Sequence, residues 1–179
     1  MKIDDSSRLS YKLMSADDAP LLFELDQDPE VMRFINRGKM TSKEDINSVF
    51  IPRMEKYRNP TQGWGLWQVN IAETMQFIGW ILVRPMEFFS GNPELDNLEL
   101  GWRFKRSSWG KGYASEAAIH IKDCLSTSKE VKNFSAIAVE DNFASIAVMK
   151  KLGMSYVKTY LHKDPLGDLT AVYYQIKNT

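Results

Sequence analysis

Two glycines one residue apart form the most distinctive chemical feature of the sequence. Gly110 and Gly112 lie in the stretch RSSWGKGYASEA, residues 106–117, with basic side chains before and between them. Glycine lets the backbone approach a ligand without a Cβ in the way, and a helix that begins directly afterwards offers free N–H groups and a positive dipole end. The pattern therefore predicts an anion site, with a phosphate or pyrophosphate as its natural ligand.

Two common phosphate-binding motifs do not fit this stretch. The nucleotide P-loop requires a glycine, four residues and then Gly-Lys-Ser/Thr, and no such string occurs. A dinucleotide fingerprint requires a third glycine where Ser115 stands, an acidic residue further along and more following chain than is present. The glycine turn therefore indicates a different phosphate ligand.

The remaining reactive side chains form no catalytic or metal-binding pattern. Cys124 falls on the apolar stripe of a predicted helix, so we expect it to pack there and not to act as a nucleophile. His120 and His162, with scattered carboxylates, have no metal-ligand spacing, and we expect no metal.

Length and charge limit the possible functions. The 179 residues suit one domain, 1–179, and 23 basic residues balance 23 acidic ones. This zero net charge argues against general binding of nucleic acid or of an anionic membrane. The chain start lacks the apolar core of a secretion signal, and no apolar run approaches the ~20 residues of a membrane span. We expect a cytoplasmic protein.

Helix-start signals occur in the first third of the sequence and again after the glycine turn. Ser15 with Asp18, Asp28 before Pro29, and Thr41 with Ser42 each predict a start, the last for a helix toward Tyr57 that is disturbed at Pro52. Two further helices are predicted, one from Tyr113 and one from Asn142 through Leu152, where Gly153 suits a C-cap.

Strand patterns occupy the middle and the end of the chain. The predicted strands are 9–14, 67–71, 77–84, 98–104, 134–139, 154–163 and 169–176, the last two forming a hairpin. Between the third and fourth, the loop PMEFFSGNPELD, 85–96, carries Phe88 and Phe89, which we expect to be exposed and to shape an acceptor site or a dimer contact. The order predicts a mixed α/β fold.

Two longer segments resemble one enzyme superfamily. SSWGKGYASEA and VEDNFASIAVMKKLGMSYV are similar to the acetyl-CoA loop and the following strand and helix of the GNAT N-acetyltransferases, and in particular of the branch that acetylates the N-terminal alanine or serine of ribosomal proteins. DPEVMRFI, FIGWILV and LELGWRF extend the resemblance over nearly the whole chain. The family pattern Gln/Arg-x-x-Gly-x-Gly/Ala matches at Gly110 and Gly112 but has Ser107 at its first position.

The resemblance implies a fold and a cosubstrate. The fold is α/β (α+β), with a central, mostly antiparallel, twisted sheet of about seven strands, helices on both faces, and a splay between strands four and five, 98–104 and 134–139. The cosubstrate is acetyl-CoA. By the same resemblance its site residues are Arg106, Ser107, Trp109, Gly110, Lys111, Gly112, Tyr113, Ala114, Asn142 and Ser145, and the acceptor is walled by Met32, Phe34 and Ile35.

Direct transfer of acetyl from the thioester to an amine, as the family performs it, needs a proton acceptor. Glu99 is the candidate, because it precedes the loop and shares a strand face with Gly101 and Arg103. The alternative is that Glu99 forms only the polar side of an amphipathic strand.

The departing thiolate needs a proton donor. Many family members have a tyrosine seven residues after the asparagine that begins the helix, but Met149 stands there. The branch resembled here implies Ser145 as the donor and Asn142 as a hydrogen-bonding partner of the pantetheine or the acceptor, with Tyr156 as a fallback donor. Asn142 also suits a helix N-cap, a role that does not exclude ligand contact.

Three functions remain open at this point. The resemblance favours acetylation of a protein N-terminal amine, while the same scaffold also suits a small amine such as an amino acid, a polyamine or an antibiotic. The departures at Ser107 and Met149 leave a third interpretation, a noncatalytic acyl-CoA-binding module. We expect a monomer or a homodimer.

Overall fold

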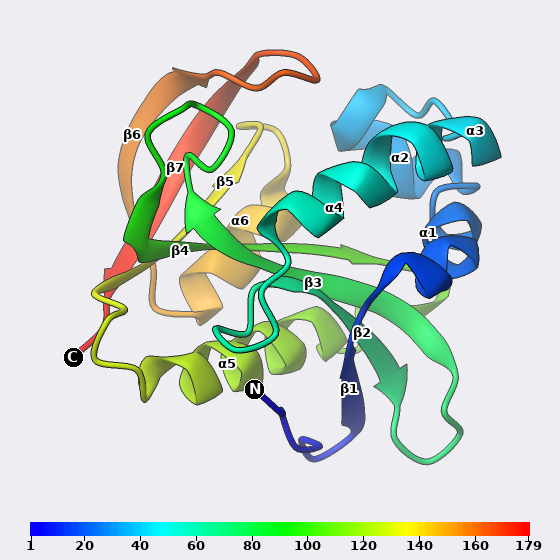
Figure 1. Ribbon diagram of the computed structural model, residues 1–179, viewed down its shortest axis with the longest axis horizontal. Helices are drawn as coiled ribbons and strands as arrows, with labels where there is room; N and C mark the ends of the chain where they lie inside the picture. The colour runs from blue at the N-terminus through cyan, green and yellow to red at the C-terminus, as the bar shows by residue number, and fades with distance from the viewer.

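A strongly twisted seven-stranded sheet forms the centre of the molecule, in a computed structural model that describes all 179 residues (Figure 1). Its order is β1-β2-β3-β4-β5-β7-β6, and only the β4–β5 pair is parallel. The strands are β1 (Leu9–Leu13), β2 (Gly65–Ile71), β3 (Phe77–Met86), β4 (Glu94–Phe104), β5 (Asn133–Ala138), β6 (Ser155–His162) and β7 (Leu169–Lys177). The predicted fold class, strand number and terminal hairpin are confirmed.

Helices cover both faces of the sheet, and Figure 1 shows α4 and α5 on opposite sides of it. One face carries α1 (Ala19–Leu25), α2 (Pro29–Asn36), α3 (Lys43–Asp45) and α4 (Ile51–Tyr57), and the other carries α5 (Tyr113–Ser126) and α6 (Phe143–Lys151). Short 3₁₀ turns lie at Ala16–Asp18 and Arg106–Ser108, and a π-helical turn at Ile46–Phe50. None of these helices is long and apolar enough to cross a membrane.

Each sheet face has its own hydrophobic core. The larger core packs sheet residues such as Ile81 and Leu98 against Ala117 and Ile121 of α5. The smaller core packs Leu66 of β2 against residues of the N-terminal helical region, Leu22, Ile46 and Met54 among them. Burial on both faces explains why β3 is almost continuously apolar.

The predicted helix starts are present. The Asp28 carboxylate accepts the Glu30 N–H at 3.0 Å, and the Ser42 hydroxyl accepts the Asp45 N–H at 3.0 Å. The helix that begins after Ser42 changes to a π-helical turn before Pro52, where the Ile51 N–H bonds to the Ile46 carbonyl. Because proline has no N–H to donate, the wider turn before it is a physically reasonable disturbance of the helix.

A fork between β4 and β5 creates the space for a ligand. The two strands pair only through Asn97–Glu99 and Asn133–Ser135. At this closed end the Ser135 hydroxyl donates to Asn97 Oδ1 at 2.6 Å and lies 2.7 Å from the Tyr173 hydroxyl of β7. Beyond it the strands separate, which confirms the predicted splay.

The predicted loop 85–96 is shorter than expected, because β3 extends through Met86 and β4 begins at Glu94. The expectation that Phe88 and Phe89 are exposed is also wrong. Both rings pack edge-on against Tyr57, with centroid separations of 5.9 and 6.2 Å, so they extend the smaller core.

Candidate active site

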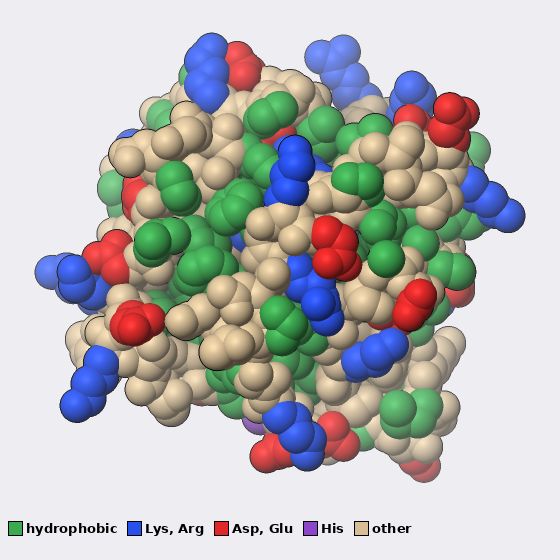
Figure 2. Space-filling view, in the orientation of Figure 1, with side chains coloured by type: hydrophobic (Ala, Val, Ile, Leu, Met, Phe, Trp, Pro, Cys, Tyr) green, Lys and Arg blue, Asp and Glu red, His purple; other side chains and the backbone are tan.

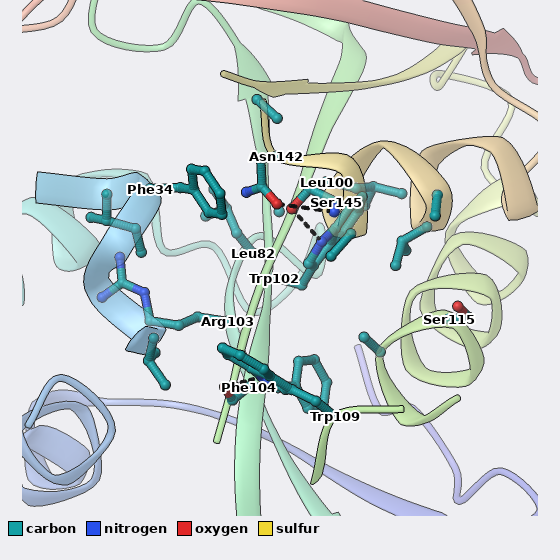
Figure 3. A pocket seen from close by; sticks show the side chains of 18 of the residues that line it. Phe34, Leu82, Leu100, Trp102, Arg103, Phe104, Trp109, Ser115, Asn142 and Ser145 are labelled. Atoms are coloured by element: carbon teal, nitrogen blue, oxygen red, sulfur yellow. Dashed lines mark hydrogen bonds between the residues drawn. The ribbon is translucent and has the colours of Figure 1, made fainter. Parts of the chain in front are cut away.

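A cavity of about 680 Å³ lies where β4 and β5 diverge. Its walls come from the separated half of β4, from the end of β5, and from the first turns of α5 and α6, while α2 closes its far side. Figure 3 shows Phe34 of α2 facing Asn142 and Ser145 of α6, with Trp102 between the sheet and α6. The fork thus joins the glycine turn to the predicted acceptor wall in one continuous site.

The glycine turn presents a row of free backbone donors to this cavity. Gly110 and Gly112 have φ angles of 73° and 79°, in the left-handed region that favours glycine. No backbone N–H from Gly110 to Ser115 donates a hydrogen bond within the chain, and the first helical bond of α5 runs from Glu116 N–H to Gly112. Nothing lies within 4 Å of a Cβ built on Gly110. Donors and open space together fit a pyrophosphate at the positive end of α5.

Contacts on both sides hold this turn in place. The Trp109 indole N–H donates to the Phe104 carbonyl at 2.9 Å, and Arg8 donates to the Lys111 carbonyl at 3.0 Å. Arg8 also pairs with Glu116 at 2.6 Å. Partial burial by itself would raise the pKa of Glu116, but hydrogen bonds from Ser6 and Arg8 outweigh it and lower that pKa. The carboxylate therefore stays charged and anchors Arg8 across the turn.

The predicted cofactor residues divide into two groups. Five of the loop residues line the cavity: Trp109, Gly110, Gly112, Tyr113 and Ala114. Lys111 is exposed outside its lining, and Arg106 and Ser107 line a separate hollow of about 400 Å³, where Arg106 pairs with Asp28 at 3.0 Å. The structure thus gives these three side chains no position in the main cavity.

Asn142 and Ser145 meet at the start of α6, as the sequence predicts. The Ser145 N–H donates to Asn142 Oδ1 at 3.2 Å, which confirms Asn142 as the N-cap. Both side chains line the cavity, and the Asn142 amide nitrogen points away from α6 toward Phe34 (Figure 3). Capping therefore leaves this nitrogen available as a donor.

Glu99 lines the cavity but is only 5 % exposed. Its Oε2 accepts from Arg84 Nε at 2.7 Å, and Arg84 stacks near the rings of Tyr57 and Phe89. Burial would lower the pKa of Arg84, but the Glu99 carboxylate outweighs it and raises that pKa. Arg84 therefore remains cationic and leaves Glu99 with one oxygen, Oε1, that has no partner in the chain.

The predicted acceptor wall is partly displaced. Phe34 and Ile35 line the cavity, whereas Met32 is 1 % exposed and packs in the interior, because the amphipathic helix α2 turns it inward. The sheet contributes wall residues that the sequence did not suggest, among them Leu82 of β3 and Leu169 of β7. Leu82 lies in a continuous apolar run and Leu169 begins its strand, so no sequence signal marks either as a wall residue.

Two other candidate side chains lie elsewhere. Tyr156, the fallback proton donor, is 55 % exposed on the edge strand β6, and its hydroxyl contacts Thr159. Cys124, expected to pack on its helix, has His120 Nε2 at 3.9 Å from its sulfur, one helical turn away. Burial raises the pKa of the Cys124 thiol, and neither residue lines the cavity.

Comparison with known proteins identifies the family to which this fork, turn and cavity belong. Residues 8–155 match the family model described as the acetyltransferase (GNAT) domain. The chain belongs to the GNAT acetyltransferase family. Among curated relatives of this GNAT enzyme is the uncharacterized protein YkkB of Bacillus subtilis, 31 % identical over 157 residues that cover 86 % of each chain.

Solved structures share the fold at lower identity. A GNAT-family acetyltransferase from Bacillus anthracis has a TM-score of 0.77 at 24 % identity, with 99 % of each chain covered. RimL, a ribosomal L7/L12 alpha-N-protein acetyltransferase in complex with coenzyme A, has 0.74 at 15 %, with 98 % of each chain covered. The aminoglycoside acetyltransferase AAC(6')-Ib, in complex with coenzyme A and kanamycin, has 0.74 at 15 %, with 94 % covered.

This GNAT enzyme uses acetyl-CoA as its cosubstrate, which supplies the acetyl group as a reactive thioester. The free N–H groups of residues 110–115 fit its pyrophosphate, and the apolar fork fits a narrow chain that leads inward. At the inner end, Ser145 and Asn142 present a hydroxyl and an amide, and Glu99 presents a carboxylate. The cavity thus holds both proton-donating and proton-accepting groups.

Proposed function

We propose that this GNAT acetyltransferase acetylates the N-terminal α-amine of a protein or peptide, such as a ribosomal protein, in the cytoplasm. The acetyl group passes directly from acetyl-CoA to the amine in a ternary complex. The carrying observation is the Glu99–Arg84 ion pair, because Arg84 compensates the buried negative charge that a polycationic acceptor would need as its partner.

The charges along the rest of the cavity support the same acceptor. Its acidic lining residues are Glu30 and Glu99, and its basic ones are Arg33, Arg103 and Lys151. Arg103 is paired with Asp26 at 2.6 Å, as Glu99 is with Arg84. A polyamine or an aminoglycoside carries several positive charges, and this lining offers them no matching acidic surplus.

The acid–base chemistry of the acceptor points the same way. An α-amine has a pKa of roughly 7.7–8.0, whereas a lysine-like amine has one of about 10.4. Near neutral pH about a tenth of an α-amine is therefore already neutral and nucleophilic, against less than about a thousandth of an alkyl amine. In this site Arg84 holds Glu99, the candidate proton acceptor. An α-amine suits such a site better than an alkyl amine, because a larger share of it arrives without the extra proton.

The walls leave room for a small first residue. Phe34, Ile35, Leu82 and Leu169 make this end of the cavity mainly apolar. Apolar walls suit a short uncharged side chain such as that of alanine or serine. The likeness in fold to RimL agrees with an acceptor of this kind.

Three side chains receive roles in this proposal. Glu99, through its free Oε1 or an intervening water, takes the proton that the amine loses. Ser145 donates a proton to the sulfur as the carbon–sulfur bond breaks, and the Asn142 amide holds the pantetheine or the acceptor. Proton transfers of this kind typically contribute roughly 10²–10⁴-fold to a rate.

A panel of acceptors tests the proposal. Peptides that begin with Ala or Ser are compared with the same peptides blocked by N-acetylation, and with spermidine and kanamycin. Release of coenzyme A thiol measures turnover, and mass spectrometry locates the new acetyl group. We expect modification of the free α-amine alone; a higher kcat/KM for spermidine or kanamycin would overturn the proposal in favour of a small-amine acceptor.

A further inference from the structure

A hydrogen bond crosses the open fork between β4 and α6. The Trp102 indole Nε1–H donates to Ser145 Oγ at 3.2 Å (Figure 3). Trp102 belongs to β4 and Ser145 to the first turn of α6, and both line the cavity. No other hydrogen bond in the structure reaches the Ser145 hydroxyl from the opposite wall of the fork.

This contact determines what the serine hydroxyl does with its own proton. An indole nitrogen is only a donor, so the Ser145 oxygen must accept from it, and the hydroxyl proton must point in another direction. With the indole in place, the Ser145 hydroxyl donates to no acceptor of the chain, and the nearby Asn142 Oδ1 accepts the Ser145 backbone N–H. The proton is therefore left for a group in the cavity.

We propose that Trp102 is a positioning residue that holds the Ser145 hydroxyl as a hydrogen-bond donor to the sulfur of coenzyme A. The inference rests on the proposed role of Ser145 and adds the group that fixes its direction. Without the indole N–H, a serine hydroxyl in a helix turns readily to the carbonyl three or four residues before it. It then no longer donates into the cavity.

The transfer step balances with Ser145 as the donor. The amine nitrogen bonds to the acetyl carbon while the carbon–sulfur bond breaks, and the bonding electron pair leaves with the sulfur. The sulfur takes the Ser145 proton, the serine oxygen recovers one from water, and the hydroxide left behind is neutralised by the proton that Glu99 releases. Meanwhile the nitrogen loses its extra proton toward Glu99. An indole N–H directed at the serine oxygen stabilises that oxygen while its proton is shared with the sulfur.

The thiol of bound coenzyme A reports this arrangement without any acceptor. The ultraviolet absorption of the thiolate is titrated against pH in complexes of coenzyme A with the wild type, Trp102→Phe, Ser145→Ala and the double variant. A hydrogen bond to a charged sulfur favours the thiolate, so each single variant should raise the pKa of the bound thiol by about one pH unit, a tenfold change. The double variant should show no further rise.

Trp64→Phe is the matched control, because Trp64 lies outside the cavity and its indole N–H has no partner in the chain. It should leave the pKa of the bound thiol unchanged. If Trp102→Phe does not fold, benzothienylalanine at position 102 keeps the ring size and replaces the N–H with sulfur. An unchanged thiol pKa in either form, or a further rise in the double variant, would overturn the proposal.

Kinetics with an accepted amine supply the second readout. Trp102→Phe should lower kcat about tenfold and leave the KM for acetyl-CoA unchanged, and it should have no further effect in the Ser145→Ala background. A raised KM with unchanged kcat would overturn the proposal, because it indicates a binding wall. Failure to acetylate any α-amine would overturn the proposed acceptor alone, since the thiol titration needs no acceptor.

Discussion

At the scale of single residues, Glu99 shows how a neighbouring strand defines the chemistry of a side chain. Alternation along β4 places it on the polar face, but only the β3–β4 register brings Arg84 directly opposite. The pair satisfies one carboxylate oxygen and leaves the other toward the cavity. Glu99 can thus be a proton acceptor and a buried ion-pair partner at once, so its two interpretations are compatible.

The substitution Glu99→Gln separates these interpretations. The glutamine amide keeps an oxygen for Arg84 but takes no proton, so we expect kcat/KM to fall about 10²-fold. The loss should be greatest at low pH, where the amine arrives protonated, and should shrink as pH rises and the amine arrives neutral. A pH–rate profile checks this, with Glu55→Gln, an exposed change on α4, as the control. Parallel profiles for the Glu99→Gln variant and the wild type would contradict the role as proton acceptor.

The site residues that sequence reasoning located are those whose function is local. The glycine turn, Asn142 as an N-cap and Ser145 three residues later each depend on a few neighbouring positions. Arg84 and the Trp102–Ser145 contact depend on strand register and on the width of the fork. Neither quantity is encoded in a short segment, so both contacts required the structure.

At the scale of elements, the turn before α5 joins backbone geometry to ligand binding. Gly110 and Gly91 both have positive φ, 73° and 87°, and in both cases an added Cβ meets nothing within 4 Å. They differ only in what surrounds them, because Gly110 lies in the cavity wall and Gly91 lies in the turn between β3 and β4. This pair allows backbone strain to be separated from loss of the anion site.

Gly110→Asp should weaken coenzyme A binding at least about 100-fold, since its carboxylate opposes the pyrophosphate charge. Gly91→Asp carries the same strain at a left-handed glycine and should bind coenzyme A normally. Calorimetric titration with coenzyme A measures both affinities, and thermal unfolding checks that the two variants lose similar stability. Equal affinities for the two variants would show that the turn does not hold the pyrophosphate.

Element boundaries were predicted well where capping or a change of period marks them. The starts of α5 and α6 and the positions of β1, β5 and β7 follow from such signals. The end of β3 and the start of β4 were missed, because PMEFFSGNPELD contains proline, glycine and asparagine, which are typical of a loop. Packing of Phe88 and Phe89 on Tyr57 instead holds the extended hairpin against the smaller core.

At the scale of the whole molecule, two cores on opposite sheet faces each include a tyrosine. Tyr11 packs against the larger core and Tyr57 belongs to the smaller one. Burial raises the pKa of each phenol to about 12. At Tyr57 burial outweighs Arg84, whose positive charge acts to lower that pKa. Over the face that Figure 2 shows, Lys and Arg side chains are interspersed with Asp and Glu.

The raised tyrosine pKa values predict an alkaline loss of stability. A phenol with a pKa of about 12 when folded and about 10 when unfolded favours the folded state fully below pH 10 and loses that contribution as pH rises toward 12. At pH 11 the loss from Tyr57 should be about 1.4 kcal/mol.

Tyr57→Phe cannot ionise, so its free energy of unfolding should fall less than that of the wild type between pH 8 and pH 11. Urea unfolding at both pH values measures this, with Tyr156→Phe, on the exposed face of β6, as the control that should follow the wild type. If the wild type and Tyr57→Phe lose equal stability over that interval, Tyr57 ionises no less readily in the folded protein than in the unfolded chain, and the smaller core does not exclude water from its hydroxyl.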